Sequence, residues 1–274
     1  MKLTFLGTAA AEGFPAVFCN CEHCQKARKL GGKNIRTRSQ TLINDDLLID
    51  LPADTYHHFL TNNIEGHKIK YLLVTHSHQD HFYMEELAMR HDPFAHNMEA
   101  EKVHVIASQG AFEKLKNMNG IEKFGIDYTE IKPFEAVSFG EYKVTGLPAN
   151  HYKGDGALIY IIEHGGKKIL YAHDTGYFYD EAFDYISENK IAFDMITLDC
   201  NMCDEKVSDH ASHMGFYNIE RVLEKLVQMG AVTDKTIKFV NHFSHNSAPF
   251  QERIEELAKP MGCLVSYDGR CVEI

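Results

Sequence analysis

The stretch "VTHSHQDH", residues 74–81, decides the fold. It places His76, His78, Asp80 and His81 directly after "IKYLLV", an apolar run that predicts a buried strand. Alternate residues share one face while a chain stays extended, so His76 and His78 point the same way, and the chain then turns. Imidazoles with a carboxylate suit zinc, manganese or iron. A histidine-rich polar loop is the alternative, but H-x-H-x-D-H after a buried strand favours a metal site.

Three further residues of metal-binding type follow predicted strands downstream. His151 follows "VTGLPAN", Asp174 follows "KILYAH" and His242 follows "IKFVN". Each alone would be read as a loop or capping residue. Taken together with the first motif, their repeated placement at strand ends predicts one site at one edge of a sheet.

The rest of the chain alternates short strand-like runs with helical patterns. "TLINDDLLID" predicts a hairpin that turns at Asn44–Asp46, and "CLVSYDGRCVEI" predicts a hairpin that ends the chain. "HMGFYNIERVLEKLVQMG" predicts an amphipathic helix that stops at Gly230. Adjacent hairpins with helices between blocks indicate two packed sheets covered by helices, in one α/β domain over residues 1–274.

The metal motif and the three strand-end residues resemble the metallo-β-lactamase superfamily over nearly the whole chain. The resemblance implies a four-layer αββα sandwich with two metal ions at the sheet edge. It also implies a ligand set in which His76, His78 and His151 bind one ion, Asp80, His81 and His242 bind the other, and Asp174 bridges the two.

The segment "FCNCEHC", residues 18–24, predicts a second metal site. Cys19, Cys21 and Cys24 offer three thiolates, and a closed tetrahedral zinc site needs a fourth ligand. His23 is the nearest candidate, but Cys24 crowds it. His245, three residues after a predicted catalytic ligand, is the better one, and it would complete a structural Cys3His zinc site. Reduced thiols in a loop and a redox-active cysteine cluster are the alternatives.

Within the superfamily, C-x-C-x-x-C together with H-x-H-x-D-H resembles the PhnP-like phosphodiesterases. The opening "LGTAAAEGFPAVFCNC" also resembles PqqB-like proteins. Where relatives carry a glycine in a "GLDDLR"-like segment, this chain has Met84 in "MEELAMR", although Arg90 fits. "HDPFAHNMEAE" then looks like an insertion, so the substrate pocket is expected to differ from that of characterised relatives.

The predicted catalytic residues are Asp80, which is also a metal ligand, and His213. By resemblance, His213 aligns with a histidine that stabilises a phosphoryl oxygen or protonates the leaving alkoxide. It is expected at the start of a helix, where the backbone favours anions. His210 is the rival, and Asp209 could orient either histidine.

Other candidates carry weaker signals. Arg36, Arg38, Arg90 and Lys153 are possible phosphate contacts, but surface basic residues are more often simply solvated, so none is singled out. The pair Cys200 and Cys203 in "LDCNMC" lacks further metal-binding partners and is expected to be buried or inert.

The composition limits the classes of partner and the cellular location that we expect for the protein. The chain has 274 residues, seven cysteines and a formal net charge of −11. An acidic protein repels nucleic acid, which also disfavours a tRNA 3′-processing endonuclease. No apolar run approaches the ~20 residues of a membrane span, and no signal peptide is visible. We therefore expect a cytoplasmic protein without a membrane partner, possibly a homodimer. The cytoplasmic setting disfavours a β-lactamase.

The expected function is metal-dependent hydrolysis of a small, possibly cyclic, phosphodiester through a metal-bridging hydroxide. Its cofactors would be two catalytic divalent ions, zinc or manganese, and one structural zinc. A lactone or thioester hydrolase and a PqqB-like accessory protein are the alternatives.

Overall fold

Two mixed sheets form the centre of the molecule in a computed structural model that describes residues 1–152 and 154–274. The first sheet has the order β14-β1-β2-β3-β4-β5-β6. Its strands are β1 (Lys2–Gly7), β2 (Gln40–Ile43), β3 (Leu47–Ile49), β4 (Tyr71–Val74), β5 (Val103–Ala107), β6 (Ile126–Glu130) and β14 (Arg270–Glu273). Strands β3 to β6 are parallel neighbours, and the others pair antiparallel.

The second sheet has the order β13-β12-β11-β10-β9-β8-β7. Its strands are β7 (Ala136–Phe139), β8 (Tyr142–Pro148), β9 (Leu158–His164), β10 (Lys167–Ala172), β11 (Met195–Asp199), β12 (Ile237–Asn241) and β13 (Leu264–Val265). Strands β10 to β13 are parallel, and β7 to β10 are antiparallel. All residues of β11 are buried, as expected for a parallel strand covered on both faces.

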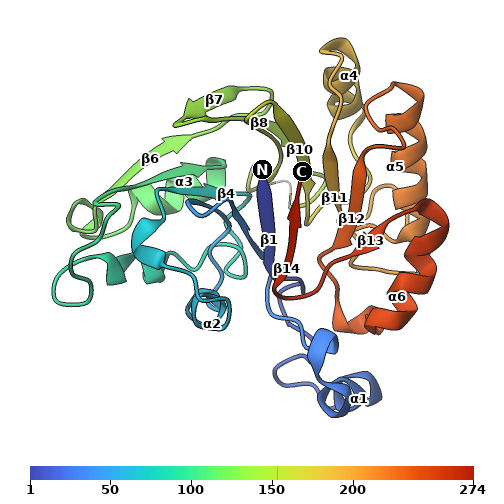
Figure 1. Cartoon of the computed structure of the whole chain (residues 1–274), viewed down its shortest axis with the longest axis horizontal. Helices are drawn as coiled ribbons and strands as arrows, with labels where there is room; N and C mark the ends of the chain where they lie inside the picture. Colours follow the sequence, from blue (N-terminus) through green and yellow to red (C-terminus); the bar gives the residue numbers. More distant parts are fainter. Residues whose placement is uncertain (153) are drawn as a thin grey trace.

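Helices cover both outer faces. They are α1 (Glu22–Leu30), α2 (Thr55–Thr61), α3 (Gln109–Lys116), α4 (Asp180–Glu188), α5 (Phe216–Gln228) and α6 (Gln251–Ala258). Figure 1 shows α4, α5 and α6 beside β11–β13, α2 and α3 on the opposite side, and α1 projecting from one end. The 3₁₀ helices are Gly32–Asn34, Gly66–Lys68, Met84–Arg90, Ile121–Lys123, His245–Ser247 and Lys259–Met261.

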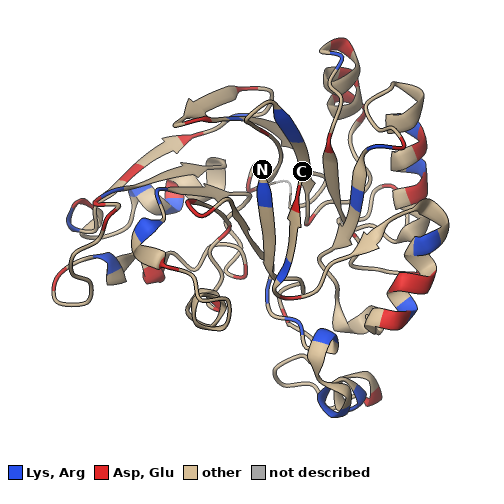
Figure 2. Cartoon of the chain, in the orientation of Figure 1, with Lys and Arg blue, Asp and Glu red and all other residues tan. Residues whose placement is uncertain are grey.

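Three apolar clusters fill the spaces between these layers. The first joins the facing sheets and includes Phe5, Tyr160 and Phe239. The second lies under α2 and α3, and the third packs α4, α5 and α6 onto β10–β12. Charged residues of both signs lie along the outer helices, and the strands between them are mostly uncharged (Figure 2). This arrangement confirms the four-layer αββα sandwich.

Two predicted details are wrong. The last segment is not a hairpin, because β13 pairs with β12 while β14 pairs with β1 in the other sheet. The helix expected to begin near His213 begins at Phe216, so His213 lies in the preceding loop. No helix in the described part of the chain is long and apolar enough to cross a membrane.

Candidate metal centre

Four strand ends bring the predicted residues to one edge of the sandwich. His76 and His78 follow β4, His151 follows β8, Asp174 follows β10 and His242 follows β12. Because β10, β11 and β12 are parallel neighbours, their carboxyl ends meet at the same edge. The backbone is left-handed at Asp174 (φ 52°) and His242 (φ 64°). That conformation costs a non-glycine residue about 1–3 kcal/mol and clusters at functional sites.

The first group consists of His76, His78, His151 and Asp174, whose ligand atoms lie within 4.8 Å of one another. His78 Nδ1 lies 3.0 Å from His76 Nε2 and 3.2 Å from His151 Nε2. Nitrogen atoms that bind one tetrahedral zinc ion at about 2.0–2.1 Å would lie about 3.3 Å apart. The spacing of the three imidazoles therefore fits one shared divalent ion.

The second group consists of Asp80, His81, Asp174 and His242. His81 Nε2 lies 3.3 Å from Asp80 Oδ2 and 3.2 Å from Asp174 Oδ2. His242 Nε2 lies 3.8 Å from the same Asp174 oxygen. His76 Nε2, which belongs to the first group, lies 3.2 Å from that oxygen as well. Asp174 therefore borders both groups, which is the position a bridging ligand needs.

Unpaired polar atoms test whether this pocket fits a cation. His81 Nε2, His242 Nε2 and Asp174 Oδ1 are buried and have no hydrogen-bond partner among the described residues. Each such atom costs about 1–3 kcal/mol when nothing satisfies it. Burial alone would raise the pKa of Asp174, but His242 and His76 hold it well below its usual value. An ionised carboxylate beside imidazole lone pairs suits divalent ions such as zinc or manganese.

Two buried carboxylates outside the predicted set orient these histidines. His81 Nδ1 donates to Asp50 Oδ2 at 2.7 Å, and His242 Nδ1 donates to Asp199 Oδ2 at 3.1 Å. Both contacts turn Nε2 toward the pocket, the usual role of a carboxylate behind a metal-binding histidine. Asp50 follows β3 and Asp199 ends β11. The strand-end signal that found the predicted ligands therefore applied to them as well.

His213 lies against the carboxylates of this pocket. Its Nδ1 is 3.3 Å from Asp199 Oδ2 and 3.3 Å from Asp174 Oδ1. Burial would lower the pKa of His213, but the hydrogen bond and charge of Asp199 outweigh it and raise the pKa to about 9. Asp199 thus favours the protonated form of His213. His213, Asp174, Asp199 and His242 form a further group, because one nitrogen or carboxylate oxygen of each lies within 4.8 Å of the others.

The rival residues lie elsewhere. His210 is exposed, and its amide donates to Ser208 Oγ. Asp209 accepts from Arg221 and Asn218, so it does not orient His213, and Asp199 takes that position. Asp199 Oδ1 accepts from the amides of Asn201 and Met214. Because both of its oxygens are engaged, Asp199 is better placed to hold the histidines than to bind an ion.

Comparison with known proteins gives the family. A family model described as "Beta-lactamase superfamily domain" matches residues 48–243, which include the H-x-H-x-D-H motif and the strand-end residues through His242. The chain belongs to the metallo-β-lactamase superfamily. That superfamily consists of metal-dependent hydrolases. No curated protein matches the sequence significantly.

Solved structures of the superfamily share the fold at low identity. A diphosphatase from the PhnP family is 20% identical with a TM-score of 0.74, and the match covers 100% of this chain and 97% of that one. Zn²⁺-bound PqqB from Methylobacterium extorquens is 15% identical with a TM-score of 0.70, and both chains are covered fully. Yeast PDE1 is 11% identical with a TM-score of 0.69, over 100% and 99% of the two chains.

The cysteine cluster lies outside the residues that match the superfamily model. Cys19, Cys21, Cys24 and His245 offer ligand atoms within 4.8 Å of one another. Cys24 Sγ lies 3.6 Å from His245 Nδ1, close to the roughly 3.5 Å separation expected for sulfur and nitrogen on one tetrahedral zinc. His23 is exposed and its ring contacts Phe250 instead. The structure thus brings His245, not His23, to the three thiols.

The local backbone favours the thiolate form of Cys21, whereas burial raises the pKa of Cys24 to about 11. Cys21 caps α1, and its sulfur accepts from the Cys24 amide. That hydrogen bond is the main reason why the pKa of the Cys21 thiol falls to about 6, and thiolate is the form that binds metal. Glu12 Oε1 accepts from the His245 amide and from Ser244 Oγ. This contact ties the loop to the segment that follows His242.

The remaining candidates do not reach the pocket. Arg36 is 2% exposed and donates to Thr8, Gln251 and the carbonyl of Ser266. Arg38 pairs with Asp54 at 3.0 Å. Arg90 lines a different cavity, and Lys153 lies outside the described residues. Cys200 and Cys203 are buried in the core behind α5.

Proposed function

We propose that the protein is a binuclear metal-dependent phosphodiesterase that hydrolyses a small linear or cyclic phosphodiester. The observation that carries the proposal is the position of Asp174. Its carboxylate borders both imidazole groups, and its Oδ1 also lies 3.3 Å from Nδ1 of another histidine, His213. A pair of cations beside a proton donor suits a substrate that is itself an anion.

The residues divide into two ligand sets and one proton donor. The ligand sets are His76, His78 and His151, and Asp80, His81 and His242, with Asp174 shared between them. Two divalent ions held there would bring the pKa of water down to about 7 and would offset the charge of a phosphate group. Because the same ligands accept zinc and manganese, the identity of the ions is left to experiment.

His213 supplies the general acid in this proposal. Asp199 accepts from its Nδ1, which leaves Nε2 as the atom that would present a proton to the substrate. During hydrolysis a hydroxide, formed when a water molecule loses one proton to the solvent, forms the new P–O bond. The bond to the leaving oxygen breaks, and His213 Nε2 gives that oxygen its proton and later regains one from the solvent. Acid–base help of this kind contributes about 10²–10⁴-fold to a rate.

Two structural neighbours support the fold on which this proposal is built. The diphosphatase from the PhnP family and yeast PDE1 share this fold over nearly the whole chain. At 11–20% identity these likenesses establish the fold, so the reaction rests on the site residues. We further propose that Cys19, Cys21, Cys24 and His245 hold a structural zinc that fixes the loop beside the catalytic ligands.

The proposed substrate class can be tested by direct comparison. The metal-loaded protein is assayed with bis(p-nitrophenyl) phosphate, p-nitrophenyl butyrate and a simple lactone at equal concentration. We expect metal-dependent release of p-nitrophenol from the phosphodiester at a rate well above the other two. Faster turnover of the carboxylic ester or the lactone would place the enzyme among lactonases or thioesterases. No turnover of any of them by fully loaded protein would favour an accessory role.

A further inference from the structure

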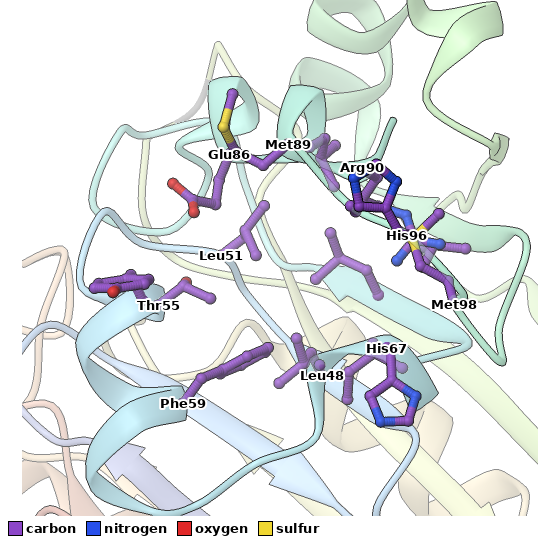
Figure 3. A pocket seen from close by; sticks show the side chains of 17 residues that line it. Leu48, Leu51, Thr55, Phe59, His67, Glu86, Met89, Arg90, His96 and Met98 are labelled. Atoms are coloured by element: carbon purple, nitrogen blue, oxygen red, sulfur yellow. The ribbon is translucent and has the colours of Figure 1, made fainter. Parts of the chain in front are cut away.

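A second cavity lies on the outer face of the first sheet. It has a volume of about 310 Å³ and lies between β3, β4, α2 and the 3₁₀ helix Met84–Arg90. Its wall is mostly apolar and includes Leu48, Leu51, Phe59 and Leu72 (Figure 3). None of the residues of the metal centre lines it. Its volume is at the lower end of the range for small-molecule pockets, about 300–1,000 Å³.

One cation at this cavity has no counter-ion. Arg90 Nη2 donates to the carbonyl of Ala100 at 2.8 Å. Its Nε is buried and has no hydrogen-bond partner among the described residues. No carboxylate of the described chain lies within 4 Å of its guanidinium, whereas Arg38 and Arg253 each have one. Burial lowers the pKa of Arg90. A partly buried guanidinium without an anion is costly.

The other polar and charged side chains of the cavity lie toward its two opposite ends. In Figure 3, Arg90, His96 and Met98 gather toward one end, and Thr55 and Glu86 lie toward the other. His96 Nδ1 is 3.3 Å from Asp92 and His67 Nδ1 is 3.7 Å from Glu99, so both histidines already have acidic neighbours. Arg90 is therefore the cation available to a ligand. The apolar wall runs from it toward Phe59.

We infer that this cavity binds a small amphipathic anion, a carboxylate with an apolar body. The body replaces water against Leu48, Leu51 and Phe59, and the carboxylate pairs with the planar guanidinium of Arg90. Arginine is suited to that contact because its donors match the two oxygens of a carboxylate. The 95–98 segment beside Arg90 lies in the stretch that looks like an insertion relative to the family pattern, whereas Arg90 itself fits that pattern.

Binding is tested by calorimetric titration of the full-length protein with sodium octanoate and with octan-1-ol. The two probes share an alkyl chain and differ in the carboxylate. We expect octanoate to bind at least about tenfold more tightly than octanol, the scale of one charge-assisted hydrogen-bonded pair. Arg90→Met, which keeps an apolar stem, should weaken octanoate by about the same factor and leave octanol unchanged. Arg253→Met, at an exposed arginine elsewhere, is the matched control.

A cavity-filling variant gives a second test. Leu48→Phe places a larger side chain in the cavity and should weaken both probes. Circular dichroism of each variant checks that it is folded. Equal binding of octanoate and octanol would mean a plain apolar void and would overturn the inference. Octanoate binding that survives Arg90→Met would also overturn it, because such binding would report a carboxylate at the metal centre. The failure of both probes to bind would overturn it as well.

Discussion

His213 Nδ1 lies 3.3 Å from Asp199 Oδ2, and the same oxygen accepts a hydrogen bond from His242 Nδ1 at 3.1 Å. One carboxylate therefore holds both a proposed metal ligand and the proposed general acid. The other oxygen of Asp199 accepts from two backbone amides, so the group is fixed in place. Its charge also raises the pKa of His213.

Replacing Asp199 should impair two functions together. We expect Asp199→Asn to lower turnover of bis(p-nitrophenyl) phosphate by about 10- to 100-fold and to weaken metal binding, because such orienting partners contribute on that scale. Asp209→Asn is the matched control, since Asp209 contacts Arg221 and Asn218 instead. Normal turnover and metal content in Asp199→Asn would show that the histidines are positioned without it.

Asp50 should matter to one of the two proposed catalytic ions. Its carboxylate accepts from His81 Nδ1 at 2.7 Å and from Thr75. We expect Asp50→Asn to weaken one ion about 10- to 100-fold in competition with a chromophoric chelator, with the other ion retained. Asp45→Asn, in the exposed β2–β3 turn, should bind both ions as the wild type does. Unchanged affinities in Asp50→Asn would contradict this role.

The fourth ligand of the cysteine site can be identified by metal analysis. His245→Ala should release one tightly bound zinc and leave the residues of the binuclear centre intact, because His245 Nδ1 lies 3.6 Å from Cys24 Sγ. His23→Ala should keep that zinc, since His23 contacts Phe250. Inductively coupled plasma measurements on both variants decide the question. An unchanged zinc count in His245→Ala would exclude it as a ligand.

His58 should make stability depend on pH. It is 1% exposed, with Nδ1 at 2.7 Å from Gln40 Oε1 and Nε2 at 2.7 Å from Thr37 Oγ1. Burial lowers its pKa from 6.5 to about 4. The unfolded chain therefore binds the proton more tightly, and the stabilisation present above pH 6.5 is lost as the pH falls toward 4. The loss should reach roughly 3 kcal/mol.

Urea unfolding of metal-free protein between pH 4 and 7 measures this effect. His58→Gln keeps a polar side chain without a titrating ring, so its unfolding free energy should fall less steeply over that range. Equal slopes for the two proteins would mean that other groups set the acid sensitivity.

Much of the fold could be predicted from the sequence because metal-binding residues recur at strand ends. His76, Asp174 and His242 each follow a predicted strand, and this repeated placement, with the resemblance to the superfamily, grouped them before any coordinates were known. The terminal segment could not be predicted in the same way. Two short apolar runs around "YDG" satisfy the local pattern of a hairpin, but Leu264 pairs with Phe239 and Val272 pairs with Leu3. Only the pairing with strands far away in the sequence distinguishes a hairpin from two strands in different sheets.

The candidate site was harder to predict because an aspartate at a strand end can either bind a metal ion or orient a metal-binding histidine. Asp50 and Asp199 follow buried strands just as Asp174 does, yet they hold histidines from behind. A strand-end aspartate does not reveal which neighbour it will face. The start of α5 was also placed too early, because "HMG" extends the helical pattern although the first helical residue is Phe216. The segments that form α1 and α4 were not predicted as helices.

The most direct test of the central claim compares the wild type with His213→Ala in the hydrolysis of bis(p-nitrophenyl) phosphate. Both proteins are loaded with zinc or manganese and shown by metal analysis to carry the same number of ions, and His210→Ala is the control. We predict metal-dependent turnover by the wild type, a loss of about 10²-fold or more in His213→Ala, and little change in His210→Ala. Turnover that persists in fully loaded His213→Ala, or none in fully loaded wild type, would contradict the phosphodiesterase mechanism.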